Sequence, residues 1–170
     1  VERVEKNESV RYPTPEEALQ KLKEEGCTRV ALVSLDIIPG IEYAYKREVF
    51  DECKPWFQRM TLGTPLVYWQ GQEEKRDDVA EVMTAVAKEL PARAEDEAVL
   101  LMAHGTPHPA NAYYAVMQAR LKNLGEERVY IYTVEGRPNL DDVVPKLKEA
   151  GIRKATLAPL MLVAGDHATN

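Results

Sequence analysis

Cysteine is scarce in this chain, which holds two cysteines among 170 residues. Cys27 and Cys53 stand alone rather than in a C-x-x-C pair, which argues against a zinc ribbon or a redox dithiol. Cys27 falls in a predicted turn and Cys53 in a predicted helix. We therefore expect both thiols to be reduced.

The sequence also lacks the motifs of several common enzyme classes. It contains no G-x-x-x-x-G-K-[ST] and no G-x-G-x-x-G, the loops that cradle phosphates. It contains no G-x-S-x-G nucleophile turn and no H-E-x-x-H zinc motif, and its only serines are Ser9 and Ser34. Nucleotide binding through such loops and serine-nucleophile chemistry are therefore not indicated.

Long apolar runs and strongly basic runs are absent as well. No run approaches the roughly 20 apolar residues that a membrane-spanning helix needs, and the charged residues 1–6 lack a signal-peptide core. The net charge is −6, whereas a nucleic-acid-binding protein needs a basic face. We expect no membrane partner, no nucleic-acid partner and a cytoplasmic location; a periplasmic location stays open because the native start is not assured.

What the sequence does contain is an alternation of helix and strand signals. Thr14 is a predicted helix N-cap, with Pro15 in the first turn and Glu17 as its capping-box partner, and Gly26 is the predicted stop. The first half then continues with strand 29–35, helix 42–57, strand 65–69 and helix 77–90.

The second half repeats the alternation. Its predicted elements are strand 98–103, helix 110–123, strand 129–134, a helix from about residue 139 that Pro145 should perturb, and strand 155–163. Strands and helices that alternate at these lengths predict parallel sheets with right-handed crossovers. The expected fold class is α/β, with two similar parallel-sheet halves at 1–92 and 93–170.

An internal repeat supports two related halves. A shift of 125 residues superimposes Pro13 on Pro138 and Gly40 on Gly165 without a gap. Identical residues match along a helix, a turn, a strand and the exit of that strand, which favours a duplication.

Three polar residues come just after predicted strands. His104 follows strand 98–103, Glu135 follows strand 129–134, and His167 comes shortly after strand 155–163. Because the carboxyl ends of parallel strands meet at one edge of a sheet, these side chains are candidates to converge. Two imidazoles and a carboxylate form a candidate divalent-metal site with open positions.

The residues around these three have other predicted roles. Gly105 allows the chain to turn after His104, and Gly136 and Gly165 are predicted to allow tight turns and close backbone approach. His108 is predicted to begin a helix rather than to bind metal, and Asp166 to orient the imidazole beside it.

Several segments resemble the anaerobic cobaltochelatases of the CbiK type. In the second half these are residues 102–111 (MAHGTPHPAN), 134–138 (VEGRP) and 159–168 (PLMLVAGDHA). Residues 37–43 (IIPGIEY) and 62–66 (LGTPL) resemble the first half of that family. The resemblance extends over nearly the whole chain.

The resemblance implies two α/β halves related by a pseudo-twofold, with a tetrapyrrole cleft between them. It also implies that Co²⁺ is the substrate metal inserted into sirohydrochlorin, a precursor in cobalamin biosynthesis, with no organic cofactor. The metal-binding His, Glu and His of the family fall on His104, Glu135 and His167. Sirohydrochlorin is rich in carboxylates, and Arg137 beside Glu135 is the candidate cation to meet one of them. A homo-oligomer stays open.

The chain departs from the family pattern in two respects. It has Asp36 where family members carry a histidine before the Ile-Pro-Gly loop. It also looks truncated at both ends, because a family member would begin with a further strand and helix and continue well past Asn170.

Three alternatives stay open. Ligand type alone does not select cobalt, so a related Fe²⁺ or Ni²⁺ chelatase fits the same residues. A metal- or tetrapyrrole-binding protein without turnover fits them as well. A hydrolase that places water at the open metal position is the third alternative.

Overall fold

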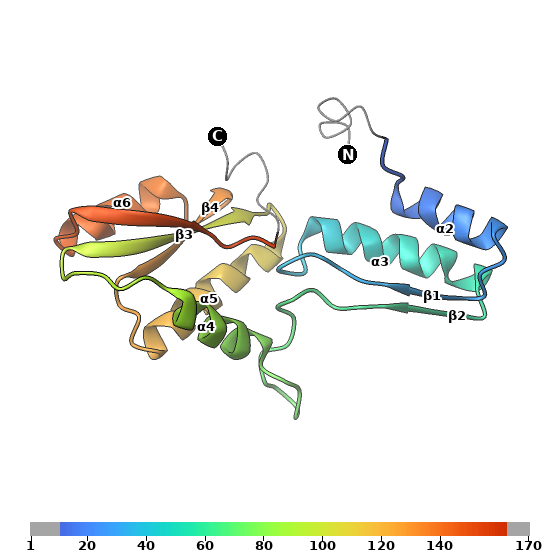
Figure 1. Ribbon diagram of the computed structural model, residues 1–170, viewed down its shortest axis with the longest axis horizontal. Coiled ribbons are helices and arrows are strands. Elements are labelled where there is room, and N and C mark those ends of the chain that lie inside the picture. Colours follow the sequence, from blue (N-terminus) through green and yellow to red (C-terminus); the bar gives the residue numbers. More distant parts are fainter. Residues whose placement is uncertain (1–10, 163–170) are drawn as a thin grey trace. The chain divides into compact units, whose positions relative to one another are not determined.

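The structure, a computed structural model, describes residues 11–162 and divides into two compact units (Figure 1). The first unit comprises Val1–Ser34 and Glu42–Thr64, and the second comprises Leu35–Ile41 and Pro65–Asn170. These units are defined by compactness, whereas the predicted halves 1–92 and 93–170 are defined by an internal duplication of the sequence. The division into halves at residue 92 therefore stays a prediction.

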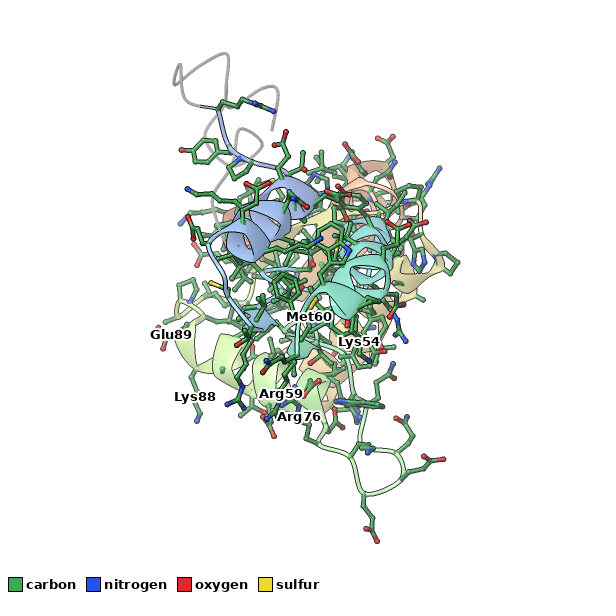
Figure 2. The ribbon with its side chains drawn as sticks, turned by 90° about the vertical axis from the view of Figure 1, so that its right-hand side faces the viewer. Lys54, Arg59, Met60, Arg76, Lys88 and Glu89 are labelled. Atoms are coloured by element: carbon green, nitrogen blue, oxygen red, sulfur yellow. The ribbon has the colours of Figure 1, made fainter. Side chains whose placement is uncertain are left out.

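The first unit is a two-stranded sheet with helices on one face (Figure 1). In chain order its elements are α2 (Pro15–Glu24), β1 (Arg29–Leu32), α3 (Ile41–Cys53), the 3-10 turn η1 (Lys54–Trp56) and β2 (Arg59–Leu62). β1 and β2 pair in parallel from Arg29 opposite Arg59 to Leu32 opposite Leu62. Leu19, Val49, Cys53, Phe57 and Met60 form its buried core, and Figure 2 labels Met60 near the end of α3.

The predicted start of α2 is confirmed. The Thr14 hydroxyl accepts the Glu17 N–H at 3.3 Å, and the Glu17 carboxylate accepts the Thr14 N–H at 3.0 Å. Gly26 follows the helix with a φ of +80°, a conformation that glycine adopts without steric cost. Cys27 is exposed and Cys53 is buried, and both are free thiols as expected.

Two strand predictions in this region are wrong. Strand β1 ends at Leu32 instead of residue 35, because its partner ends at Leu62 and the Gly63 N–H closes the ladder on the Leu32 carbonyl at 2.8 Å. Residues 65–69 form a loop in which the Val67 N–H bonds the Ile37 carbonyl at 2.8 Å. The strand of this region is instead β2, which was not predicted.

The second unit holds a three-stranded parallel sheet, which confirms the α/β class. Its strands are β3 (Glu97–Gly105), β4 (Val129–Glu135) and β5 (Lys154–Pro159), in the order β4-β3-β5. Helices α4 (Asp78–Glu89) and α5 (Tyr113–Asn123), the latter preceded by the 3-10 turn η2 (Pro109–Ala112), cover one face, and α6 (Leu140–Glu149) covers the other (Figure 1). Strand β5 ends at Pro159, earlier than predicted: the Leu160 N–H still bonds the Met102 carbonyl at 2.7 Å, but the pairing with β3 goes no further.

The outer edge of β4 is closed by groups that do not belong to a strand. The side-chain amide of Gln118 donates to the Val129 carbonyl at 2.8 Å and accepts the Ile131 N–H at 2.7 Å. The Thr133 N–H bonds the Pro138 carbonyl at 2.7 Å. Backbone groups that an edge strand would leave unpaired are therefore satisfied here.

The repeat seen in the sequence has a structural counterpart. Helix α6 begins and ends at the positions that correspond to α2 under the shift of 125 residues, and both helices carry a capping box. The glycines after them, Gly26 and Gly151, have φ values of +80° and +71°. Helix α6 continues through Pro145, so the perturbation expected there does not end it. Within residues 11–162 no helix is long and apolar enough to cross a membrane.

Candidate functional site

The predicted residues His104 and Glu135 end two neighbouring strands of the second unit. They lie within β3 and β4 rather than after them, and Gly105 pairs with Glu135 in the parallel register. Strand β3 is central, so its end lies beside the ends of both β4 and β5. The predicted meeting of strand ends is therefore present for His104 and Glu135.

The pleat of the strands places the side chains of His104 and Glu135 on opposite faces of the sheet. Ala103 pairs with Thr133 and Gly105 with Glu135. Since side chains alternate along a strand, His104 falls on the face opposite to Gly105 and Glu135. Both His104 and Glu135 are exposed, so an ion shared by them must lie beyond the ends of the strands.

The His104 ring has a hydrogen-bonding contact that bears on its tautomer. Its Nδ1 lies 3.0 Å from the carbonyl oxygen of Gly105. When Nδ1 carries the proton and donates to this carbonyl, the lone pair of the ring is on Nε2. Metal-binding histidines are commonly oriented by such a contact, and in this tautomer Nε2 is the nitrogen with a lone pair for a ligand bond.

Gly105 is required by its surroundings. Its φ is +85°, and a Cβ at this position would lie 1.6 Å from the carbonyl oxygen of Glu135 and 2.8 Å from Cβ of Thr133. The backbones of β3 and β4 approach each other here so closely that no side chain fits. The sequence predicted only that Gly105 lets the chain turn, and the close approach of the two backbones here is a further reason for glycine at this position.

The loop after β4 is organised around Gly136, Arg137 and Pro138. Gly136 has a φ of +117°, and the Arg137–Pro138 peptide bond is cis. The exposed guanidinium of Arg137 forms an ion pair with Asp142 in the first turn of α6. The pKa of Asp142 is held below its ordinary value, chiefly because the carboxylate accepts the backbone N–H of Asn139 and also because of the pairing with Arg137.

Asn111 connects the two strand exits, and the sequence patterns did not identify it. Its side-chain oxygen accepts the N–H of Thr106 at 3.1 Å, and its side-chain nitrogen donates to the carbonyl of Arg137 at 2.5 Å. Its signals in the sequence are its place just after the first exit loop and at the end of segment 102–111, and neither reveals the second partner.

His108 has the helix-starting role predicted for it. Its Nδ1 accepts the N–H of Ala110 at 3.1 Å and so caps η2. Its own N–H donates to the hydroxyl of the buried Thr106 at 3.2 Å. These bonds connect the loop after His104 to the start of η2.

A cavity of about 310 Å³ adjoins the end of β4. It is lined by Tyr132, Thr133, Val134, Asn139, Leu140 and Asp141. Val134 and Leu140 are 40% and 42% exposed, so large apolar side chains face solvent beside the candidate ligands. An apolar surface of this kind suits a flat organic ligand that carries polar groups at its rim.

The third predicted metal ligand cannot be placed. His167, together with Gly165 and Asp166, lies outside the described residues. Within residues 11–162, no three side chains of His, Cys, Asp or Glu come together in a way that would hold a metal ion. The described part of the chain therefore supplies His104 and Glu135 as neighbours but no complete cluster.

Comparisons with known proteins agree with the fold and with the family resemblance. Sirohydrochlorin cobaltochelatase of Salmonella typhimurium strain LT2 is 34% identical over 170 residues, covering 100% of this chain and 62% of that protein. Sirohydrochlorin cobaltochelatase CbiKC of Nitratidesulfovibrio vulgaris strain Hildenborough is 37% identical over 155 residues, covering 89% of this chain and 52% of that protein. The chain thus spans between about half and two thirds of the length of these relatives.

A solved structure has a similar fold. SirB from Bacillus subtilis with Fe³⁺ superimposes with a TM-score of 0.61 at 18% identity, covering 94% of this chain and 63% of that one. The family model for cobalt chelatase (CbiK) matches residues 1–170. The chain therefore belongs to the cobalt chelatase (CbiK) family.

Proposed function

We propose that this chain carries the metal site of a chelatase that inserts Co²⁺ into sirohydrochlorin. His104, Glu135 and His167 hold the ion in this proposal, and the macrocycle receives it. The observation that carries the site is the parallel pairing of Gly105 with Glu135, which brings the ends of β3 and β4 together. The family match and the names of the two relatives support cobalt and sirohydrochlorin as the substrates.

The chemistry of metal insertion suits these residue types. The reaction removes two protons from pyrrole nitrogens and transfers a partly desolvated cation to the ring. A neutral imidazole both binds a divalent cation and accepts a proton at neutral pH. His104 is exposed at the end of the central strand. In this proposal it binds the ion through Nε2 and, once the ion has passed to the ring, takes up one pyrrole proton on the same nitrogen, while the other proton leaves to solvent.

Arg137 is the proposed contact for a substrate carboxylate. Its side chain is 71% exposed and paired with Asp142, so the guanidinium is accessible to a second carboxylate. Arginine recognises carboxylates through two parallel hydrogen bonds. Replacing Arg137 with glutamate is expected to raise KM for sirohydrochlorin more than it lowers kcat.

The test is an anaerobic incubation with metal-free sirohydrochlorin and Co²⁺, followed by the visible spectrum of the tetrapyrrole. We expect conversion to the cobalt complex, and a loss of at least tenfold in rate for His104→Ala. His108→Asn is the matched control, because asparagine retains a side-chain acceptor for capping η2 and His108 has no assigned role in metal binding. A rate for His104→Ala within tenfold of the wild-type rate would refute the role of His104.

Metal choice and turnover are resolved by the same assay. Parallel reactions with Fe²⁺ and Ni²⁺ compare the related chelatase activities, which ligand type alone does not separate. Binding of sirohydrochlorin without metal insertion would favour a carrier over an enzyme. His167→Ala in the same series tests the third ligand.

A further inference from the structure

We propose that Asn111 is a positioning residue of the metal site, whose side-chain amide sets the separation between the loops that follow His104 and Glu135. This inference rests on the proposed function and adds a residue that touches neither the ion nor the macrocycle.

The amide of Asn111 holds equivalent points of the two loops. It accepts the N–H of Thr106 at 3.1 Å and donates to the carbonyl of Arg137 at 2.5 Å. Thr106 lies two residues after His104, and Arg137 lies two residues after Glu135. One planar group therefore spans the gap between the two strand exits just beyond the candidate ligands.

The amide is itself held in place. The backbone N–H of Asn111 donates to the carbonyl of His108 at 2.9 Å, so the residue belongs to the turn that His108 caps. A Cβ built on Gly136 would lie 3.0 Å from the side-chain oxygen of Asn111 and 3.3 Å from its nitrogen. The amide thus packs against the backbone of Gly136, where the absence of a side chain leaves room for it.

A side-chain amide provides both contacts from one planar group. The Thr106 N–H requires an acceptor and the Arg137 carbonyl requires a donor. Aspartate supplies acceptors alone and would place a negative charge against the Arg137 carbonyl, whereas alanine supplies neither group. The ladder between β3 and β4 ends at Gly105 and Glu135, so the bridge joins the two segments beyond their last paired residues.

The expected effect falls on the affinity for the metal ion. Loss of a group that orients a metal ligand commonly weakens metal binding by roughly 10–100-fold. We therefore expect Asn111→Ala and Asn111→Asp to raise the Kd for Co²⁺ by about tenfold or more. The readout is an anaerobic titration of the 170-residue chain, followed by the visible absorbance of bound Co²⁺.

Gln118→Ala is the matched control. Gln118 makes the same pair of bonds, a donor to the Val129 carbonyl and an acceptor for the Ile131 N–H, but in the body of β4 rather than at its exit. Both alanine variants lose one amide and two hydrogen bonds. If Asn111 only stabilised the fold, the two variants would change the thermal midpoint and the Co²⁺ affinity alike; we expect Gln118→Ala to leave the Kd unchanged.

A second measurement tests whether Asn111 acts through Glu135. In a Glu135→Ala background, Asn111→Ala should have little further effect on the Kd, because the ligand it positions has gone. The same fold-change in both backgrounds, or an equal loss in Gln118→Ala, would overturn the inference while the proposed function stands. If Glu135→Ala itself leaves Co²⁺ binding unchanged, the proposed site fails and the inference fails with it.

Discussion

Replacing Gly105 by alanine is expected to destabilise the protein by about 2–5 kcal/mol. The φ of +85° is the first contribution, since a left-handed conformation costs an L-residue about 1–2 kcal/mol. The second is the collision of the new methyl group with the Glu135 carbonyl oxygen, 1.6 Å from the ideal Cβ position. Overpacking against well-packed surroundings costs about 1–3 kcal/mol, and here the obstacle is backbone rather than a side chain that could rotate away.

Gly125→Ala separates the two contributions. Gly125 has a φ of +84° and no atom within 4 Å of its ideal Cβ position. Both substitutions also restrict the unfolded chain in the same way. The difference between the two variants therefore isolates the collision, which we expect at about 1–3 kcal/mol.

The assay is urea denaturation of the wild type and both variants, followed by far-ultraviolet circular dichroism. A common slope allows the midpoints to be compared as free energies. The reasoning about close approach would be refuted if Gly105→Ala lost no more stability than Gly125→Ala.

Three further predictions concern groups away from the proposed metal site or at its margin. The pKa of Asp142 is lowered in the folded protein, chiefly because the carboxylate accepts the Asn139 N–H. Such a carboxylate stabilises the folded state at any pH above its ordinary pKa, and this stabilisation is lost as the pH falls through the pKa of the folded state. Thermal midpoints of the wild type and Asp142→Asn should therefore differ at neutral pH and converge as the pH falls below 3.8. The Glu16 carboxylate accepts the hydroxyl of Tyr45 and raises its pKa to about 12, so Glu16→Gln should move the ionisation of one tyrosine back toward 10.0 in an ultraviolet titration; an unchanged titration curve would contradict this. Met117 is fully buried, and Met117→Ala should cost about 2–5 kcal/mol in urea denaturation, unlike a surface substitution.

The helices were predictable because their signals are local. Thr14 and Glu17 mark the start of α2 within four consecutive positions, and the capping box they form is present in the structure. The sequence also predicted a helix from about residue 139, and α6 begins at Leu140. Helix propensity and capping depend on residues that are close in sequence, so a local sequence pattern contains most of the information that sets where a helix begins and ends.

The short strands were less predictable because a strand is defined by its partner. Residues 65–69 have the apolar character of a buried strand, but two of their N–H groups bond the loop at 36–37 and two bond the Asp78 carboxylate. Strand β2 is short and carries Arg59 and Thr61 on an exposed face. Only its pairing with β1 makes it a strand, and pairing over that distance leaves little trace in local composition.

One part of the candidate site was predictable from the sequence and another part was not. The nearness of His104 and Glu135 follows from alternating elements, since the ends of adjacent parallel strands meet. The bridge from Asn111 to Arg137 depends on how two loops settle against each other after folding. No spacing rule predicts such a contact, so a residue of this kind becomes visible only in three dimensions.

The two edges of the sheet in the second unit differ, because the backbone groups along the outer edge of β4 are already hydrogen-bonded. Gln118 and Pro138 occupy the positions where a further strand would bond, so an intruding chain would first have to break bonds that already exist. No strand among residues 11–162 pairs with the far side of β5. Among residues 11–162, the edge beside β5 is therefore the one at which a further strand could pair without displacing the bonds of Gln118 and Pro138. Self-association through this sheet is in that sense one-sided.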